Sequence, residues 1–211
     1  MESQGPRSVK IGEDERGGWS SDRPRRGGGP PRPADISTRC SVLRPTDALR
    51  YSPGSLLLIA SASADERDRF TDRLIESKSA LLSIPKVRAL LEGRVAPEEI
   101  DERAEQLLEQ AAKKRFEAGE TVVIATDGLD PAERERYTRL AHSFRRPRHI
   151  ILIETSREAV PEDSRAALND LRKKLDSGGL GAEGFQTALR LGGEARSEVK
   201  RIVFAPPPKD D

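Results

Sequence analysis

A run of apolar residues in the first third of the chain ends where a phosphate-binding loop would begin. Residues 55–60, Ser-Leu-Leu-Leu-Ile-Ala, predict a buried strand. A loop that binds nucleotide phosphates has glycines at its first and sixth positions, so that backbone amides wrap the phosphates, and then a lysine and a hydroxyl residue. In that register, Ala60 and Asp65 replace the two glycines. Glu66 replaces the lysine and Arg67 replaces the hydroxyl residue, so two carboxylates stand where a phosphate would bind.

The helix that follows this strand is predicted to cap its own first turn. Ser63 and Glu66 have the spacing of a capping box, in which the serine side chain accepts from the Glu66 amide and the Glu66 carboxylate accepts from the Ser63 amide. The helix dipole then favours the protein's own carboxylates by roughly 0.3 to 1 kcal/mol each. Losing the lysine removes the cation that neutralises the charge that develops in phosphoryl transfer. These residues argue against conventional phosphotransfer.

Length, charge and cysteine content limit the classes of protein to be considered. The 211 residues allow one globular domain of ordinary size and a tail. Lys and Arg number 37 against 36 Asp and Glu, so the formal net charge of +1 gives no global attraction to nucleic acid or to a membrane. The single cysteine, Cys40, excludes an internal disulfide and favours a reducing compartment, so we expect a cytoplasmic protein. The longest apolar runs are far shorter than the ~20 residues that span a bilayer, and no signal peptide is recognised.

The two ends of the chain differ in composition from its middle. Residues 1–39 mix Gly, Pro, Ser, Arg and acidic residues with few aliphatic side chains, which predicts a disordered tail. Residues 205–211 predict a second disordered end, which leaves a domain at residues 40–204. The segment Arg23–Arg32 is similar to arginine-glycine segments that bind RNA through its phosphates, so RNA is a candidate partner. The alternative is that this segment is a solvated linker.

Apolar strands alternate with amphipathic helices along the middle of the chain. Strands that are apolar throughout indicate a mainly parallel sheet covered on both faces. The fold class predicted is therefore three-layer α/β/α with a sheet of about five strands. The strands are expected at residues 55–60, 80–84, 121–125, 149–153 and 185–191, and the helices at 64–77, 97–118, 130–144 and 164–175.

Five short segments follow one another in an order and spacing typical of one class of kinase. They are Gly54–Ile59, Arg88–Leu91, Val122–Asp127, Leu171–Leu175 and Glu183–Phe185. From about residue 53 to 204 the chain resembles the P-loop kinases of the polynucleotide-kinase-like family, which are ATP-binding kinases. The resemblance implies a P-loop NTPase-like fold, ATP and magnesium as cofactors, an aspartate that activates the acceptor hydroxyl, and a lid helix rich in arginine.

The chain departs from this family at positions that carry its catalysis. Pro85 stands where the acceptor-activating aspartate is expected, and Ile124 stands where the third strand commonly has an acidic residue. For Arg165, Arg172 and Lys173, the resemblance implies lid cations that contact phosphates. The alternative is that these three are solvated charges on a helix surface.

Other residues that bear chemistry are few. Arg145, Arg146 and Arg148 form a compact basic patch between a helix and a strand, where a phosphate or an acidic partner would bind; the alternative is a solvated loop. His142 and His149 are the only histidines, and with one cysteine they do not form a usual zinc site, so we expect no metal and structural roles for both.

Three functional hypotheses follow from these residues. The first is a catalytically inactive kinase-like domain, a pseudokinase that binds or regulates a protein partner and needs no cofactor. The second is a phosphotransferase of polynucleotide-kinase type that binds ATP and magnesium through an atypical phosphate loop. The third is weak RNA binding through the basic N-terminal arm, with an affinity that falls steeply with salt. A further alternative is an ordinary α/β domain whose ancestors had no phosphate loop.

Overall fold

The computed structural model describes residues 34–206, apart from the side chain of Arg157. The basic segment Arg23–Arg32 and most of both predicted tails lie outside these residues. The compact unit begins at Asp35, a few residues before the boundary predicted at residue 40. Ile36 is 4% exposed, and the Thr38 amide donates a hydrogen bond of 2.9 Å to the Gly181 carbonyl. Residues 35–39 therefore belong to the folded domain.

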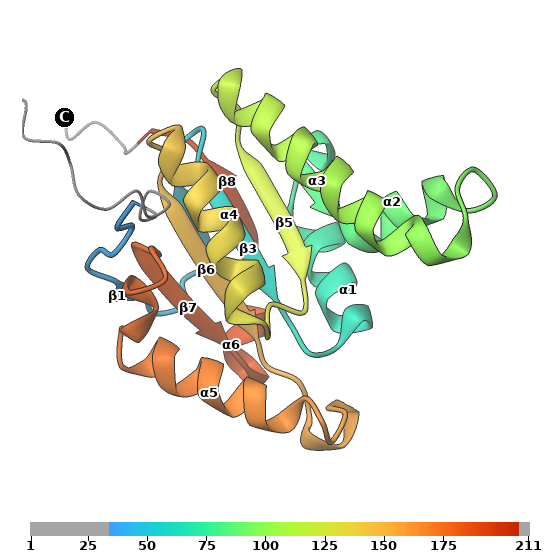
Figure 1. Cartoon of the computed structure of the whole chain (residues 1–211). Coiled ribbons are helices and arrows are strands. Elements are labelled where there is room, and N and C mark those ends of the chain that lie inside the picture. The colour runs from blue at the N-terminus through green and yellow to red at the C-terminus, as the bar shows by residue number, and fades with distance from the viewer. Residues whose placement is uncertain (1–33, 207–211) are drawn as a thin grey trace, which may run out of the picture. The chain divides into compact units, whose positions relative to one another are not determined.

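The centre of the domain is a six-stranded sheet in which every pair of neighbours is parallel. The carboxyl ends of its long strands point to the lower edge of Figure 1. The middle strands are buried along their whole length, because both faces of the sheet are covered. In spatial order the strands are β1 (Ser41–Val42), β7 (Thr187–Leu191), β6 (Arg148–Ile153), β3 (Leu56–Ala60), β5 (Val122–Thr126) and β4 (Leu81–Ser83).

The helices and a small second sheet cover the two faces of the central sheet. On one face, Leu108 of α3, Tyr137 of α4 and Leu171 of α5 pack in one core with Leu56 and Leu58 of β3. The other face is covered by α1 together with a two-stranded parallel sheet, β2–β8. The predicted three-layer α/β/α fold is thus confirmed. The covering elements are α3 (Ile100–Glu117), α4 (Pro131–Ser143), α5 (Arg165–Asp176), α1 (Ala64–Leu74), β2 (Ala48–Tyr51) and β8 (Arg201–Phe204).

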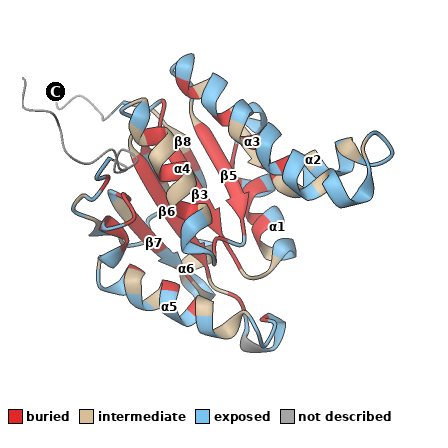
Figure 2. Cartoon of the chain, viewed as in Figure 1, coloured by how far each residue is buried: buried red, intermediate tan, exposed pale blue. Residues whose placement is uncertain are grey.

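Several elements differ from the sequence-based expectation. The strand predicted at residues 80–84 is shorter in the structure, where β4 covers only Leu81–Ser83. The chain then continues directly into a helix that was not predicted, α2 (Ile84–Leu91). No residue of α2 is buried. Together with the adjacent beginning of α3, this helix projects from the body of the domain (Figure 2). The short helix α6 (Gly193–Glu198) and the strands β1, β2 and β8 were also not predicted. None of the helices among residues 34–206 is both long and apolar enough to cross a membrane.

His149 has the structural role expected for it, in a buried position of β6. Its Nδ1 lies 2.8 Å from Thr187 Oγ1, and its ring lies against Tyr51 with 4.7 Å between the ring centres. Burial, together with a smaller effect of Arg148, lowers the pKa of His149 from 6.5 to about 4. The imidazole is therefore neutral in the folded protein at neutral pH.

The depressed pKa of His149 makes folding stability depend on pH. The unfolded chain takes up a proton at His149 as the pH falls below 6.5, whereas the folded chain does so only near pH 4. The free energy of unfolding is therefore expected to fall by up to about 1.4 kcal/mol for each pH unit in this interval. The effect is measured by urea unfolding of the wild type and of His149→Phe at several pH values between 4 and 6.5. The variant serves as the reference, because phenylalanine binds no proton. Equal slopes in the two proteins would contradict the prediction.

Candidate functional site

The loops after β3 and β6 meet at the topological switch point of the sheet. The connection from β3 leads to β4 on one side, whereas the connection from β6 leads to β7 on the other. Ligands of open α/β sheets bind in the crevice that such diverging loops leave at the carboxyl edge. Here Ser61, after β3, and Thr155, after β6, join the two loops through their hydroxyl oxygens, 3.1 Å apart.

The loop between β3 and α1 contains only Ser61, Ala62 and Ser63, and its two serine side chains accept from the amides of Ser63 and Glu66. The Ser63 side chain accepts a hydrogen bond of 3.4 Å from the Glu66 amide, so the predicted N-cap is confirmed. The second half of the predicted capping box is wrong. The Ser63 amide donates instead to Ser61 Oγ, at 3.2 Å, and the Glu66 carboxylate pairs with Arg196.

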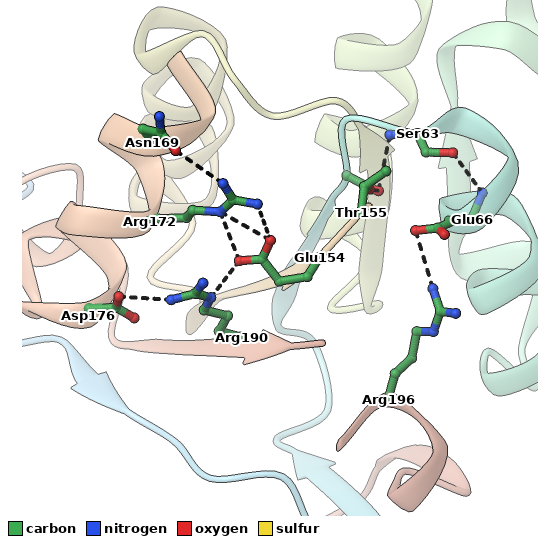
Figure 3. Close-up of polar contacts among 10 residues, drawn as sticks. Ser63, Glu66, Glu154, Thr155, Asn169, Arg172, Asp176, Arg190 and Arg196 are labelled. Atoms are coloured by element: carbon green, nitrogen blue, oxygen red, sulfur yellow. Dashed lines mark hydrogen bonds and ion pairs between the residues drawn. The ribbon is translucent and has the colours of Figure 1, made fainter. Parts of the chain in front are cut away.

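The four residues predicted as a degenerate phosphate loop lie at the end of β3 and in the first turn of α1. The Glu66 carboxylate turns away from the loop and forms an ion pair of 3.2 Å with Arg196 of α6, as Figure 3 shows. Asp65 is exposed, and Ala60 is fully buried. Arg67 is 5% exposed and lies 3.4 Å from the Asp68 carboxylate. A phosphate at this position would meet an occupied helix start and two acidic side chains.

Glu154, the first residue after β6, holds two arginines beside the switch point (Figure 3). Its carboxylate accepts hydrogen bonds from Arg172 of α5 and from Arg190 of β7. Arg190 also forms an ion pair of 2.9 Å with Asp176. Burial acts to raise the pKa of Glu154, but the hydrogen bonds and charges of the two arginines outweigh it and hold the pKa below its usual value. Arg172 is thus bound to a carboxylate of the protein itself.

A cavity of about 460 Å³ opens beside Glu154, between the β6 loop and the start of α5. Arg165 is half-buried there, and its Nε is buried with no hydrogen-bond partner among the described residues. Lys173, the third predicted lid cation, is exposed and does not line this cavity. The cavity is lined by Thr155, Val160, Arg165, Leu168, Asn169 and Arg172.

The position expected for an acceptor base holds no carboxylate. Pro85 is exposed in the first turn of α2, and Ile124 is buried in the middle of β5. A neighbouring cavity, lined in part by Asp68, Asp72 and Ser83, has a volume of only about 50 Å³. Such a volume holds a few water molecules at most and no acceptor substrate. Residues 34–206 also contain no group of three or more His, Cys, Asp or Glu side chains that could hold a metal ion.

The basic patch lies at the amino edge of the sheet, away from the switch point. Arg148 is the first residue of β6, and Arg145 and Arg146 precede it after the end of α4. The structure therefore separates these three arginines from Arg165 and Arg172, at the carboxyl edge, instead of forming one site.

A buried ion cluster was missed by the sequence analysis. Arg134 of α4 is 1% exposed and donates to the Glu183 carboxylate at 2.7 and 2.8 Å, and Lys174 donates to the same carboxylate at 2.9 Å. Arg134 also donates to the carbonyls of Gly128 and Leu129, in the β5–α4 loop. The only signal in the sequence was an arginine on the inner side of a helix, since its partner carboxylate comes 49 residues later.

Comparisons with known proteins add a similarity of fold. No protein-family model matches the chain, and no curated protein matches it significantly. Among solved structures it is similar to a candidate kinase from Chloroflexus aurantiacus, with a TM-score of 0.44 and 12% sequence identity. The match covers 65% of this chain and 84% of that one. The functional argument therefore rests on the residues of this chain.

Proposed function

We propose that this chain is a P-loop-kinase-like domain that lacks phosphotransfer activity and acts as a binding or regulatory module for a protein partner. The observation that carries the proposal is the closed loop between β3 and α1. Three residues connect the strand to the helix, and the amides of Ser63 and Glu66 donate to side chains of the loop itself. A nucleotide-binding loop needs those amides free to surround the phosphates.

Charge at the same place supports an inactive domain. No lysine or arginine of the loop is free to contact a phosphoryl group during its transfer, because Arg67 is buried in α1 beside Asp68. Glu66 lies at the position of the family's lysine and is engaged with Arg196. Phosphoryl transfer depends almost entirely on positioning and on neutralising the charge of the transferred group. The residues present here would oppose both.

The test is isothermal titration calorimetry of the full chain with ATP and with GTP, each with and without magnesium. We expect no saturable heat at nucleotide concentrations up to about 1 mM, which corresponds to a binding free energy weaker than about −4 kcal/mol. Micromolar binding that requires magnesium would overturn the proposal and restore a nucleotide-binding function.

A matched variant separates the length of the loop from its side chains. Asp65→Gly combined with Glu66→Lys restores the family residues at two positions and leaves the three-residue connection unchanged. We expect this double variant to bind nucleotide no better than the wild type. If it gains binding, the two carboxylates, and not the closed loop, are what prevent binding.

The cavity beside Glu154 favours one second candidate, a nucleotide-binding phosphotransferase with an atypical phosphate loop. Arg165 supplies an unpartnered Nε there, and Asn169 and Thr155 supply further polar groups. If the wild type does bind ATP in the calorimetric experiment, Arg165→Ala tests this candidate. Loss of binding in that variant would assign the nucleotide to the α5 cavity, and unchanged binding would exclude it.

A further inference from the structure

We propose that the basic loop at the amino edge of the sheet is a binding site for a phosphate monoester, independent of the kinase-like switch point. The site is an open cavity of about 530 Å³ between the end of α4 and the beginnings of β6 and β7. Its lining includes Arg145, Arg146 and Arg148, together with His142 and Gln186. A cavity of this volume lies in the range that holds small ligands.

Arg148 is a buried cation with no negative partner among residues 34–206. It is 6% exposed, and its Nε donates to the Gly184 carbonyl at 2.6 Å. Its remaining contacts are His142 Nδ1, at 3.0 Å, and the Arg146 carbonyl, at 3.5 Å. Burial lowers the pKa of Arg148, and no carboxylate counters that effect. Buried charges in proteins are normally paired, so an uncompensated guanidinium in the wall of a cavity points to an anionic ligand.

The other arginines of the cavity also lack carboxylate partners within residues 34–206. Arg146 donates to the Phe116 carbonyl at 2.7 Å, and its Nε is buried without a hydrogen bond. Arg145 is exposed. The carbonyl end of α4 supplies about half a negative charge, which is too little to balance three guanidinium groups.

Other side chains of the cavity also carry hydrogen-bond donors. Arg148 can only donate, so His142 accepts through Nδ1, which leaves the ring hydrogen on Nε2 as a donor. The side-chain oxygen of Gln186 accepts from the Arg148 amide, which leaves the nitrogen of Gln186 as a donor. Guanidinium groups and N–H donors together match an anion with several oxygens.

A phosphate monoester fits this set of donors better than a carboxylate does. A carboxylate has one charge and two oxygens, and a single guanidinium satisfies both oxygens. A phosphate monoester carries nearly two charges near neutral pH and three free oxygens, so it can engage several guanidinium groups at once.

The backbone at Arg145 is strained in a way that glycine at this position would not be. Arg145 has a φ of 56°, and it is the only non-glycine residue of residues 34–206 with a positive φ. It follows α4 at the position where a helix usually ends in glycine, because a Cβ atom is strained in the left-handed conformation. Arg145→Gly therefore relieves strain and removes one guanidinium.

The experiment is an NMR titration of the full chain with inorganic phosphate, at an ionic strength held constant with sodium chloride. We expect saturable shifts at the amides of Arg145, Arg146, Arg148, His149 and Gln186, with a dissociation constant of about 1 mM or tighter. Acetate, the carboxylate probe, is expected to bind at least about tenfold more weakly. Absence of saturation up to about 10 mM phosphate, or equal binding of acetate, would overturn the proposal.

Arg145→Gly is expected to lower the affinity for phosphate and to raise the thermal stability of the protein. We expect it to weaken phosphate binding by about 5- to 20-fold and to raise the melting temperature by about 1 to 3 °C. Lys113→Ala is the matched control, because it removes one exposed positive charge from α3, at a residue that does not line the cavity. Its phosphate affinity should equal that of the wild type. If Arg145→Gly also leaves the affinity unchanged, or if Lys113→Ala weakens it as much, the phosphate interacts only with the general charge of the protein.

Discussion

Glu183→Ala is expected to lower the free energy of unfolding by about 3 to 5 kcal/mol, because it leaves the cation of Arg134 buried without its partner. The carboxylate and the guanidinium are 4% and 1% exposed and share two hydrogen bonds. Lys174, at the surface, loses the same partner. Urea unfolding at neutral pH measures the loss, and a decrease below about 1 kcal/mol would show that Arg134 finds another partner or becomes hydrated.

The effect of Glu183→Ala should depend on pH. Burial acts to raise the pKa of Glu183, but the hydrogen bonds from Arg134 and Lys174 outweigh it and lower the pKa. The stabilisation by this carboxylate is therefore complete above its unfolded pKa of about 4.5, and it is lost as the pH falls through the folded value. Glu183→Leu combined with Arg134→Met is the control, because an apolar pair of similar volume leaves no buried charge. This double variant is expected to be more stable than Glu183→Ala.

Gly128→Ala is expected to lower the free energy of unfolding by about 2 to 5 kcal/mol, from backbone strain and overpacking together. Gly128 has a φ of 64°, and a Cβ at this position would lie 2.6 Å from Ala60 Cβ. Ala60 is fully buried at the end of β3, so it has no room to move away. Chemical denaturation of the variant tests the prediction, and a loss smaller than about 1 kcal/mol would mean that the loop relaxes freely.

A second substitution at Ala60 separates the two causes. Ala60→Gly removes the methyl group that the new side chain would strike, and the next nearest atoms lie at 3.4 Å. In a double-mutant cycle we expect it to recover about 1 to 3 kcal/mol of the loss, while the strain of the positive φ remains. An interaction energy near zero would attribute the whole effect to the backbone. The cycle also links the methyl group of Ala60 to the need for glycine at position 128.

The elements that sequence analysis predicts best are those that local pattern decides. The apolar runs of β3, β5 and β6 are unambiguous, because parallel strands covered on both faces carry apolar side chains at every position. Capping is equally local: Asp130, which precedes the first-turn proline of α4, accepts from the Ala132 amide at 2.9 Å. The N-cap at Ser63 is correct for the same reason.

The features that were missed depend on partners far along the chain. The spacing of Ser63 and Glu66 predicts a capping box, but the Glu66 carboxylate pairs with Arg196, which lies 130 residues away. β2 and β8 are four residues each and include exposed arginines, so neither resembles a strand until the other is placed beside it. Arg134 is a charged residue on a helix, a pattern that usually indicates a solvated surface, and only its contact with Glu183 accounts for its burial.

The pairing of β2 with β8 also constrains the order in which the domain is completed during synthesis. Ala48 and Arg201 are neighbours in a parallel pair, although almost the whole domain is translated between them. Until β8 leaves the ribosome, the face that carries Leu57 and Ile59 is covered by α1 without the small sheet, and Leu49 and Tyr51 lack their strand partner. A nascent chain stalled before residue 201 therefore exposes apolar surface and a free strand edge, which are the features that chaperones bind.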